Sequence, residues 1–219
     1  MNEAVRPNAW LPRVKYLLFG VVGLMMLMVL ENNERFLINQ HDPIWNHYQP
    51  FKWWLLPHGI AGALALFLGP LQFSDSFRKR FIRWHRIAGR FYVGAAMIAA
   101  PLGVYIQHTL GPPPLVTVTN VDAALLMFTT GMGLTMALMG NIQAHKQWMT
   151  RSYVVALVFL EVRCVQAVPW LSNMVDENSQ ADMWICLVFS LLVADLILQG
   201  GEMMKRRSMP KQSTAALAR

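Results

Sequence analysis

The sequence is poor in charged residues and in cysteine. Only 14% of its 219 residues are charged, whereas roughly a quarter are charged in an ordinary soluble domain. Its two cysteines, Cys164 and Cys186, both fall inside apolar segments, which supports neither a disulfide framework nor a thiolate metal site. The sequence also lacks a G-x-S-x-G elbow, a phosphate-binding glycine loop and an H-E-x-x-H motif. These absences argue against the common hydrolases, nucleotide enzymes and zinc proteases.

Apolar residues are abundant instead, and they make up 55% of the chain. A helix needs about 20 mostly apolar residues to cross the hydrocarbon core of a bilayer. Six segments come close to that length, at about 14–30, 56–73, 88–107, 120–140, 152–170 and 181–199. We therefore predict an all-α integral membrane bundle of six transmembrane helices over residues 1–203, with helices 2 to 5 as its core. The basic segment 204–219 is predicted to be a disordered cytoplasmic tail.

Lysine and arginine are unevenly distributed along the chain, which has a net charge of +7. Sixteen of the nineteen Lys and Arg residues lie in four places. Three lie before or at the start of the first segment, six lie at the connection between the second and third segments, two lie at the connection between the fourth and fifth, and five follow the sixth. Cytoplasmic loops of membrane proteins collect Lys and Arg, so this pattern places both termini in the cytoplasm. It also explains the positive charge without a nucleic-acid partner.

One stretch, from Ser76 to Val93, gathers basic residues around a single histidine, His85. The basic residues are Arg78, Lys79, Arg80, Arg83, Arg86 and Arg90. A second stretch repeats the order histidine, basic residue, then Arg-x-Tyr-Val, with a spacing that differs by one residue: His145, Lys146, Arg151, Tyr153 and Val154. Each stretch lies where a membrane helix is predicted to begin, so both histidines are placed at the cytoplasmic boundary.

Two imidazoles at one depth on separate helices can bind opposite faces of a haem iron. On this hypothesis His85 and His145 are the metal ligands, and Arg86, Arg90 and Arg151 bind the haem propionates or an anionic electron donor, because guanidinium groups make planar two-point contacts. An alternative needs no cofactor. Basic residues at a cytoplasmic boundary follow from topology, and histidines among them can bind lipid phosphate or a helix end.

A second pair of histidines, His58 and His108, is predicted near the external boundary. Residues 85 to 108 would cover about 35 Å of helix, so one helix carries a histidine at each membrane face. We consider a second haem held by His58 and His108, although this pair lacks flanking cations. The small residues of the second and third segments allow either close helix packing or room for a flat cofactor.

Several ionisable residues fall within the predicted spans, among them Glu161, Arg163, Asp195 and Asp122. Glu161 and Arg163 lie near the middle of the fifth, and because they are two residues apart they point to different faces. Glu161 is expected to meet a partner on another helix, and Asp195 is placed to reach Arg90 or Arg151. Asp122 is expected in the first turn of the fourth helix, where the helix dipole favours a negative charge.

Four motifs together carry a family resemblance: His58-Gly59, Gly69-Pro70-Leu71-Gln72-Phe73, Trp84-His85-Arg86 with Gly89-Arg90-x-Tyr92, and His145-Lys146-x-Trp148-Met149-x-Arg151-Ser152-Tyr153. As a set they resemble a family of bacterial multi-pass membrane proteins defined only as a domain of unknown function, over about residues 55–165. In architecture the chain is also similar to the cytochrome b561 group. That likeness implies a haem between the third and fifth spans, as His85 and His145 would provide. It implies another between the second and fourth, but residues 121–139 contain no histidine.

The leading functional hypothesis is a haem b electron-transfer protein of the bacterial inner membrane, with the lipid bilayer around it and a quinol or another small electron donor as its partner. Two alternatives stay open. One is a small-solute or proton transporter that uses the intramembrane charges of His58, Glu161, Arg163 and Asp195. The other is a cofactor-free membrane subunit of a complex. A homodimer is compatible with each of them.

Overall fold

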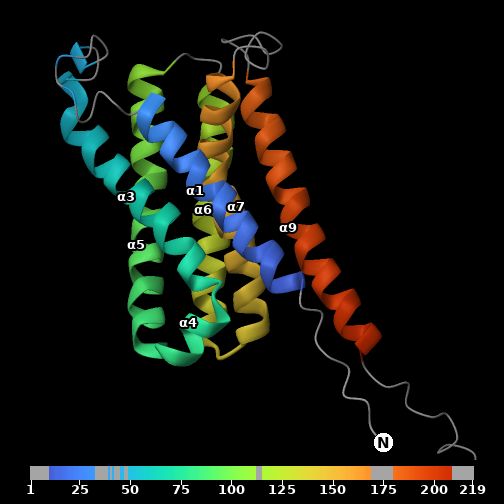
Figure 1. Ribbon diagram of the computed structural model, residues 1–219. Helices are drawn as coiled ribbons and strands as arrows, with labels where there is room; N and C mark the ends of the chain where they lie inside the picture. Colours follow the sequence, from blue (N-terminus) through green and yellow to red (C-terminus); the bar gives the residue numbers. More distant parts are fainter. Residues whose placement is uncertain are drawn as a thin grey trace, which may run out of the picture.

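The computed structural model describes residues 10–32, 39, 41, 45–46, 49–111, 115–168 and 180–208. Within these ranges the chain is helical and contains no strand, which confirms the all-α prediction (Figure 1). The elements are α1 (Trp10–Asn32), the 3-10 turn η2 (Gln49–Phe51), α3 (Lys52–Gln72), α4 (Asp75–Arg80), α5 (Ile82–Leu110), α6 (Leu115–Leu138), α7 (Ile142–Ala167) and α9 (Ala181–Ser208).

Four helices, α3, α5, α6 and α7, form the central bundle, and they correspond to the predicted core helices 2 to 5. In this bundle α5 packs against α3 and α6, while α7 packs against α6 and, over a shorter length, α3. Helices α5 and α7 therefore lie diagonally opposite each other. Helix α1 packs against α7 and crosses the front of the bundle in Figure 1, and α9 covers another side of α7.

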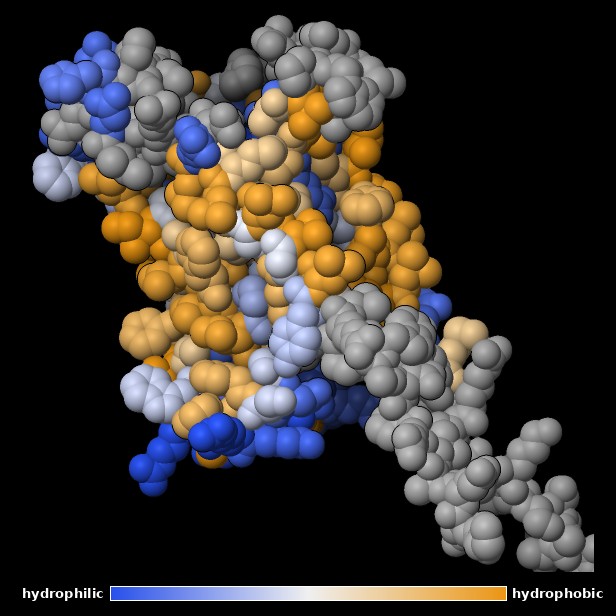
Figure 2. All heavy atoms as spheres, in the orientation of Figure 1, coloured by the Kyte–Doolittle hydropathy of each residue, from blue (hydrophilic) through white to orange (hydrophobic). Residues whose placement is uncertain are grey.

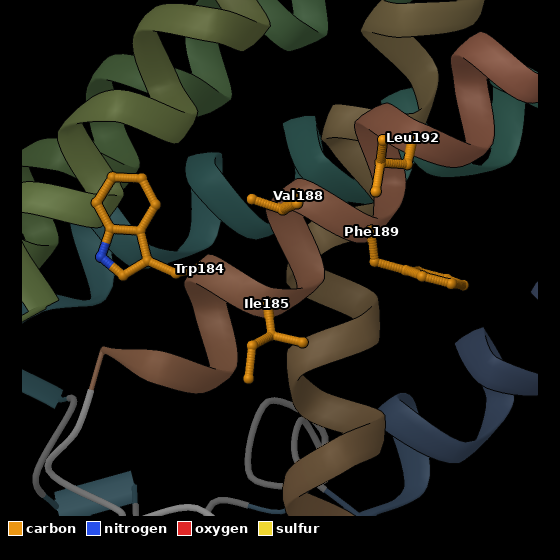
Figure 3. A pocket seen from close by; sticks show the side chains of 5 residues that line it. All are labelled: Trp184, Ile185, Val188, Phe189 and Leu192. Atoms are coloured by element: carbon orange, nitrogen blue, oxygen red, sulfur yellow. The ribbon is translucent and has the colours of Figure 1, made fainter.

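The outer surface of the bundle is apolar across its middle. Figure 2 shows an apolar band there. Large apolar side chains are exposed on several helices, for example Phe67 of α3, Ile98 of α5 and Leu134 of α6. A shallow hollow on the outside of α9 is lined entirely by apolar or aromatic residues of that helix, Trp184, Ile185, Val188, Phe189 and Leu192 (Figure 3). Lipid chains are the natural neighbours of such a surface, because water would solvate it poorly.

Four helical segments are long and apolar enough to cross a membrane: Gln49–Gln72, Ile82–Leu110, Leu115–Leu138 and Ala181–Gly200. Helix α7 is not among them and carries Glu161 and Arg163, while the apolar part of α1 found among the described residues is Phe19–Glu31. The protein is thus a multi-pass membrane protein with four candidate spans in its described part. The count of six spans stays a prediction.

Two short connections bring the beginnings of α5 and α7 to the same end of the bundle (Figure 1). Ser74 caps α4 by accepting a hydrogen bond from the Phe77 amide at 3.2 Å, and α5 follows directly after α4. At the α6–α7 turn, Gly140 adopts a φ of 76°, a left-handed conformation that glycine enters without strain. Asn141 then caps α7 by accepting from the Ala144 amide at 3.1 Å.

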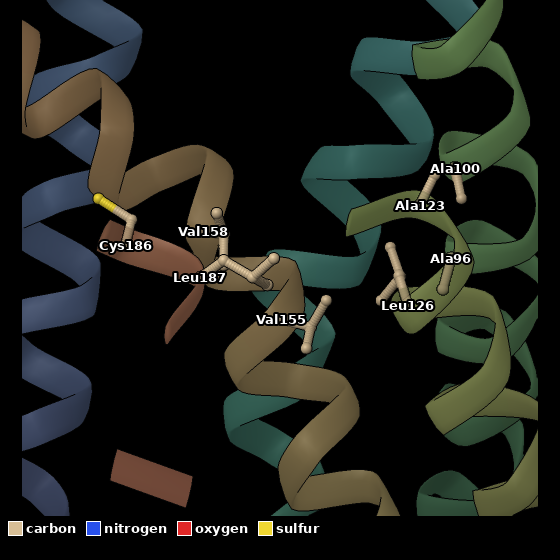
Figure 4. Close-up of a cluster of buried hydrophobic side chains, with 8 residues drawn as sticks. All are labelled: Ala96, Ala100, Ala123, Leu126, Val155, Val158, Cys186 and Leu187. Atoms are coloured by element: carbon tan, nitrogen blue, oxygen red, sulfur yellow. The ribbon is translucent and has the colours of Figure 1, made fainter. Parts of the chain in front are cut away.

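Small residues allow the core helices to approach closely. Figure 4 shows Ala96 and Ala100 of α5 meeting Ala123 and Leu126 of α6 in the largest buried cluster, which Val155, Val158, Cys186 and Leu187 complete. Gly69 of α3 serves the same purpose, because the Tyr153 ring lies where a Cβ on that glycine would be. At these positions the small residues serve close helix packing.

Several helices differ in extent from the predicted segments, and two of these differences bear on other predictions. Helix α6 begins at Leu115 and not near 120, because Val118 is fully buried and packs as part of the helix. Asp122 consequently lies about two turns inside α6, so the prediction that it sits in the first turn was wrong. Helix α9 continues to Ser208, so residues 204–208 of the predicted tail are helical, whereas residues 209–219 lie outside the described part.

Candidate functional site

The candidate site lies at the basic end of the bundle. We define the basic end as the end that holds α4 and the first turns of α5 and α7, with Arg78, Lys79, Arg80, Arg83 and Arg86. Figure 2 shows hydrophilic residues gathered at this end below the apolar band. His85 is in the first turn of α5 and His145 is in the first turn of α7. The two histidines therefore belong to the same level of the bundle, as the sequence predicted.

A hydrogen bond deeper in the bundle shows which faces of α5 and α7 meet. The Tyr92 hydroxyl lies 2.8 Å from the Ser152 hydroxyl, and both side chains are buried. Tyr92 follows His85 by seven residues, and Ser152 follows His145 by seven residues. Residues seven apart share one helix face and lie about 10.5 Å apart along the axis. His85 and His145 are therefore on the faces of α5 and α7 that look toward each other.

His145 is held in a defined orientation by α6. Its Nδ1–H donates to the Gly133 carbonyl oxygen at 2.7 Å. Gly133 itself is buried against α7, because the Met149 sulfur lies where its Cβ would be. A histidine whose Nδ1 is occupied by a backbone carbonyl keeps Nε2 as its free nitrogen, which is the arrangement commonly found at metal-ligating histidines.

His85 lies within electrostatic range of His145 and is half-buried, with Arg78 and Arg86 close enough to act on its charge. Its Nδ1 is completely buried and has no hydrogen-bond partner in the described part of the chain. The same holds for the Gln72 side-chain nitrogen.

Gln72 reaches α5 next to Gly89, one turn beyond His85: its side-chain oxygen is 3.3 Å from where a Cβ on Gly89 would be. Side chains of an α-helix lean toward its N-terminus, so the place left empty by Gly89 faces His85. The missing side chain at Gly89 therefore gives the Gln72 amide room on the His85 side of α5.

The arginines of the prediction have different surroundings. Arg151 forms a 2.7 Å ion pair with Asp195 of α9 and lies over the Trp148 ring at 5.5 Å. This contact confirms Arg151, one of the two partners predicted for Asp195, and it turns the Arg151 side chain toward α9. Arg86 and Arg90 are exposed on α5 at the basic end, so both can meet an anion that approaches from the aqueous side. Arg78 is paired with Asp75 at 2.9 Å.

Inside the bundle, the site has a polar floor that sequence reasoning did not find. Ser152 contacts Tyr92 on one side and the Thr130 hydroxyl on the other, at 2.7 Å, and all three side chains are buried. Thr130 and Gly133 belong to α6. The sequence did not identify them as site residues, because Thr130 contributes only a hydroxyl group and Gly133 only a backbone carbonyl. Gln72, Gly89 and Ser152 were present in the quoted motifs but received no role, whereas Tyr92 was predicted only to line the site.

The second histidine pair has separate partners. His58 Nδ1–H donates to the Ala99 carbonyl oxygen at 2.9 Å, and its ring fills the space beside Gly103 of α5. His108 Nε2–H donates to the Asn120 side-chain oxygen at 3.1 Å, and His108 is exposed. One histidine is thus engaged by α5 and the other by α6. The second haem stays a prediction.

His85 and His145 are the two candidate metal ligands at the basic end. Among the described residues no group of three or more His, Cys, Asp or Glu could hold a metal ion. A haem needs only two protein ligands, because the porphyrin supplies four nitrogens, and axial histidines are among its usual ligands. His145 with a free Nε2, His85 facing it and a rim of arginines fit that requirement.

Comparison with known proteins places the chain in a family. A family model described as "Predicted membrane protein (DUF2306)" matches residues 55–198, which run from α3 into α9. No curated protein and no solved structure matches the chain. The match spans well over half of the sequence and includes all four motifs quoted above, so the predicted family resemblance is confirmed. The chain belongs to the DUF2306 family of predicted membrane proteins.

Proposed function

We propose that this protein is a haem b electron-transfer protein of the bacterial inner membrane. The observation that carries the proposal is the facing of His85 and His145 from diagonal helices, fixed by the Tyr92–Ser152 hydrogen bond two turns deeper. In the proposed complex the two histidines are the axial ligands. Haem, when bound, would supply a one-electron carrier.

The remaining residues of the site have distinct roles in this proposal. The Gly133 carbonyl keeps the His145 ring oriented and its Nε2 available. Arg86 and Arg90 are exposed beside the site and offer positive charge to the propionates or to an anionic donor such as a quinol or another small reductant. Arg151 contributes less than the sequence suggested, because it is already paired with Asp195. The buried Tyr92, Ser152 and Thr130 close the site toward the membrane interior.

The proposal includes six spans with both termini in the cytoplasm. Helix α1 begins and α9 ends toward the same end of the bundle as α4, which carries three consecutive basic residues (Figure 1). An even number of crossings and the preference of basic residues for the cytoplasmic side both agree with this arrangement. The site would then face a cytoplasmic or membrane-dissolved donor.

The test is the colour and ligation of the purified protein. Protein made in haem-replete cells should show a Soret band and a low-spin electron paramagnetic resonance signal typical of bis-histidine haem. His85→Ala and His145→Ala should each abolish that same signal, whereas His41→Ala, a change in an exposed residue outside the bundle, should preserve it. A colourless preparation, or loss of the signal in only one of the two variants, would overturn the proposal.

A further inference from the structure

A pair of carboxylates lies in the half of the bundle opposite the histidine site. Asp122 of α6 and Glu161 of α7 are within electrostatic range of each other, on two helices that pack along their length. Glu161 is sixteen residues beyond His145, which corresponds to about 24 Å along α7. The pair is therefore separate from the proposed haem site.

The hydrogen bonds of this pair are incomplete. Ser190 of α9, itself fully buried, donates to Glu161 Oε1 at 2.7 Å. This contact confirms the expectation that Glu161 meets a partner on another helix. Glu161 Oε2 and Asp122 Oδ1 are both completely buried, and neither has a hydrogen-bond partner in the described part of the chain. Each helix thus brings one unsatisfied acceptor to the interior.

Among the described residues, none of the groups that act on Asp122 or Glu161 carries a positive charge. Cys164 of α7 and Cys186 of α9 lie within electrostatic range of Glu161, and Asp182 of α9 acts on Cys186. Asp182 already accepts a hydrogen bond from Gln166 at 3.2 Å. Arg163, the nearest cation along α7, lies over the Phe159 ring and within range of His58, as expected for a residue on another face. On the α5 side, Ala100 and Val104 pack against the same core.

If both carboxylates were ionised, one buried acceptor oxygen on each side chain would have no donor in the described part of the chain, at a depth where charge is costly. One proton changes this balance, because it converts one of these acceptor oxygens into a donating O–H group. A single shared proton also leaves one negative charge in place of two. We propose that Asp122 and Glu161 share one proton and form an intramembrane proton-binding site. The site does not depend on haem and gives the chain the chemistry of a proton carrier.

Infrared spectroscopy of the full-length protein in lipid nanodiscs tests this directly. At neutral pH the wild-type protein should show the carbonyl stretching band of a protonated carboxylic acid, and the band should move in heavy water. Glu161→Gln and Asp122→Asn should each shift or remove the band, and the double variant should remove it. Ser190→Ala should shift the band without abolishing it, because the hydroxyl donates to Glu161.

Asp182→Asn is the matched control, since it neutralises a hydrogen-bonded carboxylate of the same region and should leave the band unchanged. The substitutions are nearly isosteric, and size-exclusion profiles with thermal midpoints establish that each variant is folded. A wild-type protein without the band would overturn the proposal, as would a band that is the same in both single variants. A band that appears only after sodium and potassium are removed would also overturn it, because a cation would then occupy the pair.

Discussion

Tyr92 on α5 and Ser152 on α7 join two helices that lie diagonally across the bundle, through a 2.8 Å hydrogen bond between their hydroxyl groups. The contact is fully buried, and Ser152 is bonded on its other side to Thr130. It orients three helices around one point. It is also the contact from which the facing of His85 and His145 follows.

Removal of the Tyr92 hydroxyl should loosen this junction. Tyr92→Phe keeps the ring and deletes one buried hydrogen bond, which should lower the free energy of unfolding by about 1 kcal/mol. Thermal unfolding of the detergent-solubilised protein measures the effect. Tyr105→Phe is the control, because Tyr105 is an exposed residue of the same helix and its loss should change little. Equal midpoints for the two variants would show that the junction contributes nothing.

Close packing at Gly69 should tolerate no added side chain. A methyl group there would meet the Tyr153 ring, so Gly69→Ala should destabilise the protein by about 1–3 kcal/mol. Gly94→Ala makes the same chemical change at an exposed position of α5 with no atom within 4 Å of the new Cβ, and it should be neutral or slightly stabilising. Fluorescence-detected size-exclusion chromatography after graded heating distinguishes the two. A Gly69 variant as stable as the Gly94 variant would contradict the packing.

The ion pair between Arg151 and Asp195 should make a small but measurable contribution to stability. Both side chains are partly exposed, at 30% and 48%, so we expect a coupling energy of about 0.5–1 kcal/mol. A double-mutant cycle with Arg151→Gln and Asp195→Asn measures it by denaturant unfolding. The pair of Arg78 and Asp75 within α4, whose side chains are 28% and 68% exposed, provides the comparison and should couple no more strongly. If the effects of the two single substitutions on the free energy of unfolding simply add up in the double variant, the ion pair contributes nothing to stability.

The proposed topology predicts opposite locations for two loops. Alkaline phosphatase fused after Gly111, which follows α5, should be active because it reaches the periplasm. The same enzyme fused after Gly140, in the turn between α6 and α7, should be inactive, because that turn lies at the basic end. Activity of both fusions, or of the second alone, would invert the placement of the histidine site.

Much of the fold was predictable because membrane helices are encoded by long apolar runs, and the basic clusters mark their ends. The pairing of Arg151 with Asp195 was predictable for a related reason, because opposite charges at the same depth of a membrane protein tend to pair with each other. The orientation of His145 was not predictable, because its hydrogen-bond partner is the backbone carbonyl of Gly133. Every residue has such a carbonyl, so the sequence does not indicate which one accepts the bond. The position of Asp122 was missed because burial of Val118 extends α6 by more than a turn, and no local signal announces that burial.

The turn at Gly140 controls more than a change of chain direction. The His145 hydrogen bond to Gly133 spans it, so the chain between these residues has one permitted length. A single residue inserted into the first turn of α7, before His145, would rotate the rest of the helix by about 100° around its axis relative to the cap at Asn141. Ser152 would then leave Tyr92, His145 would swing away from His85, and Glu161 would lose Asp122. The start of α7 therefore determines which face of this helix meets its neighbours. The histidine site and the pair of Asp122 and Glu161 both depend on that rotation.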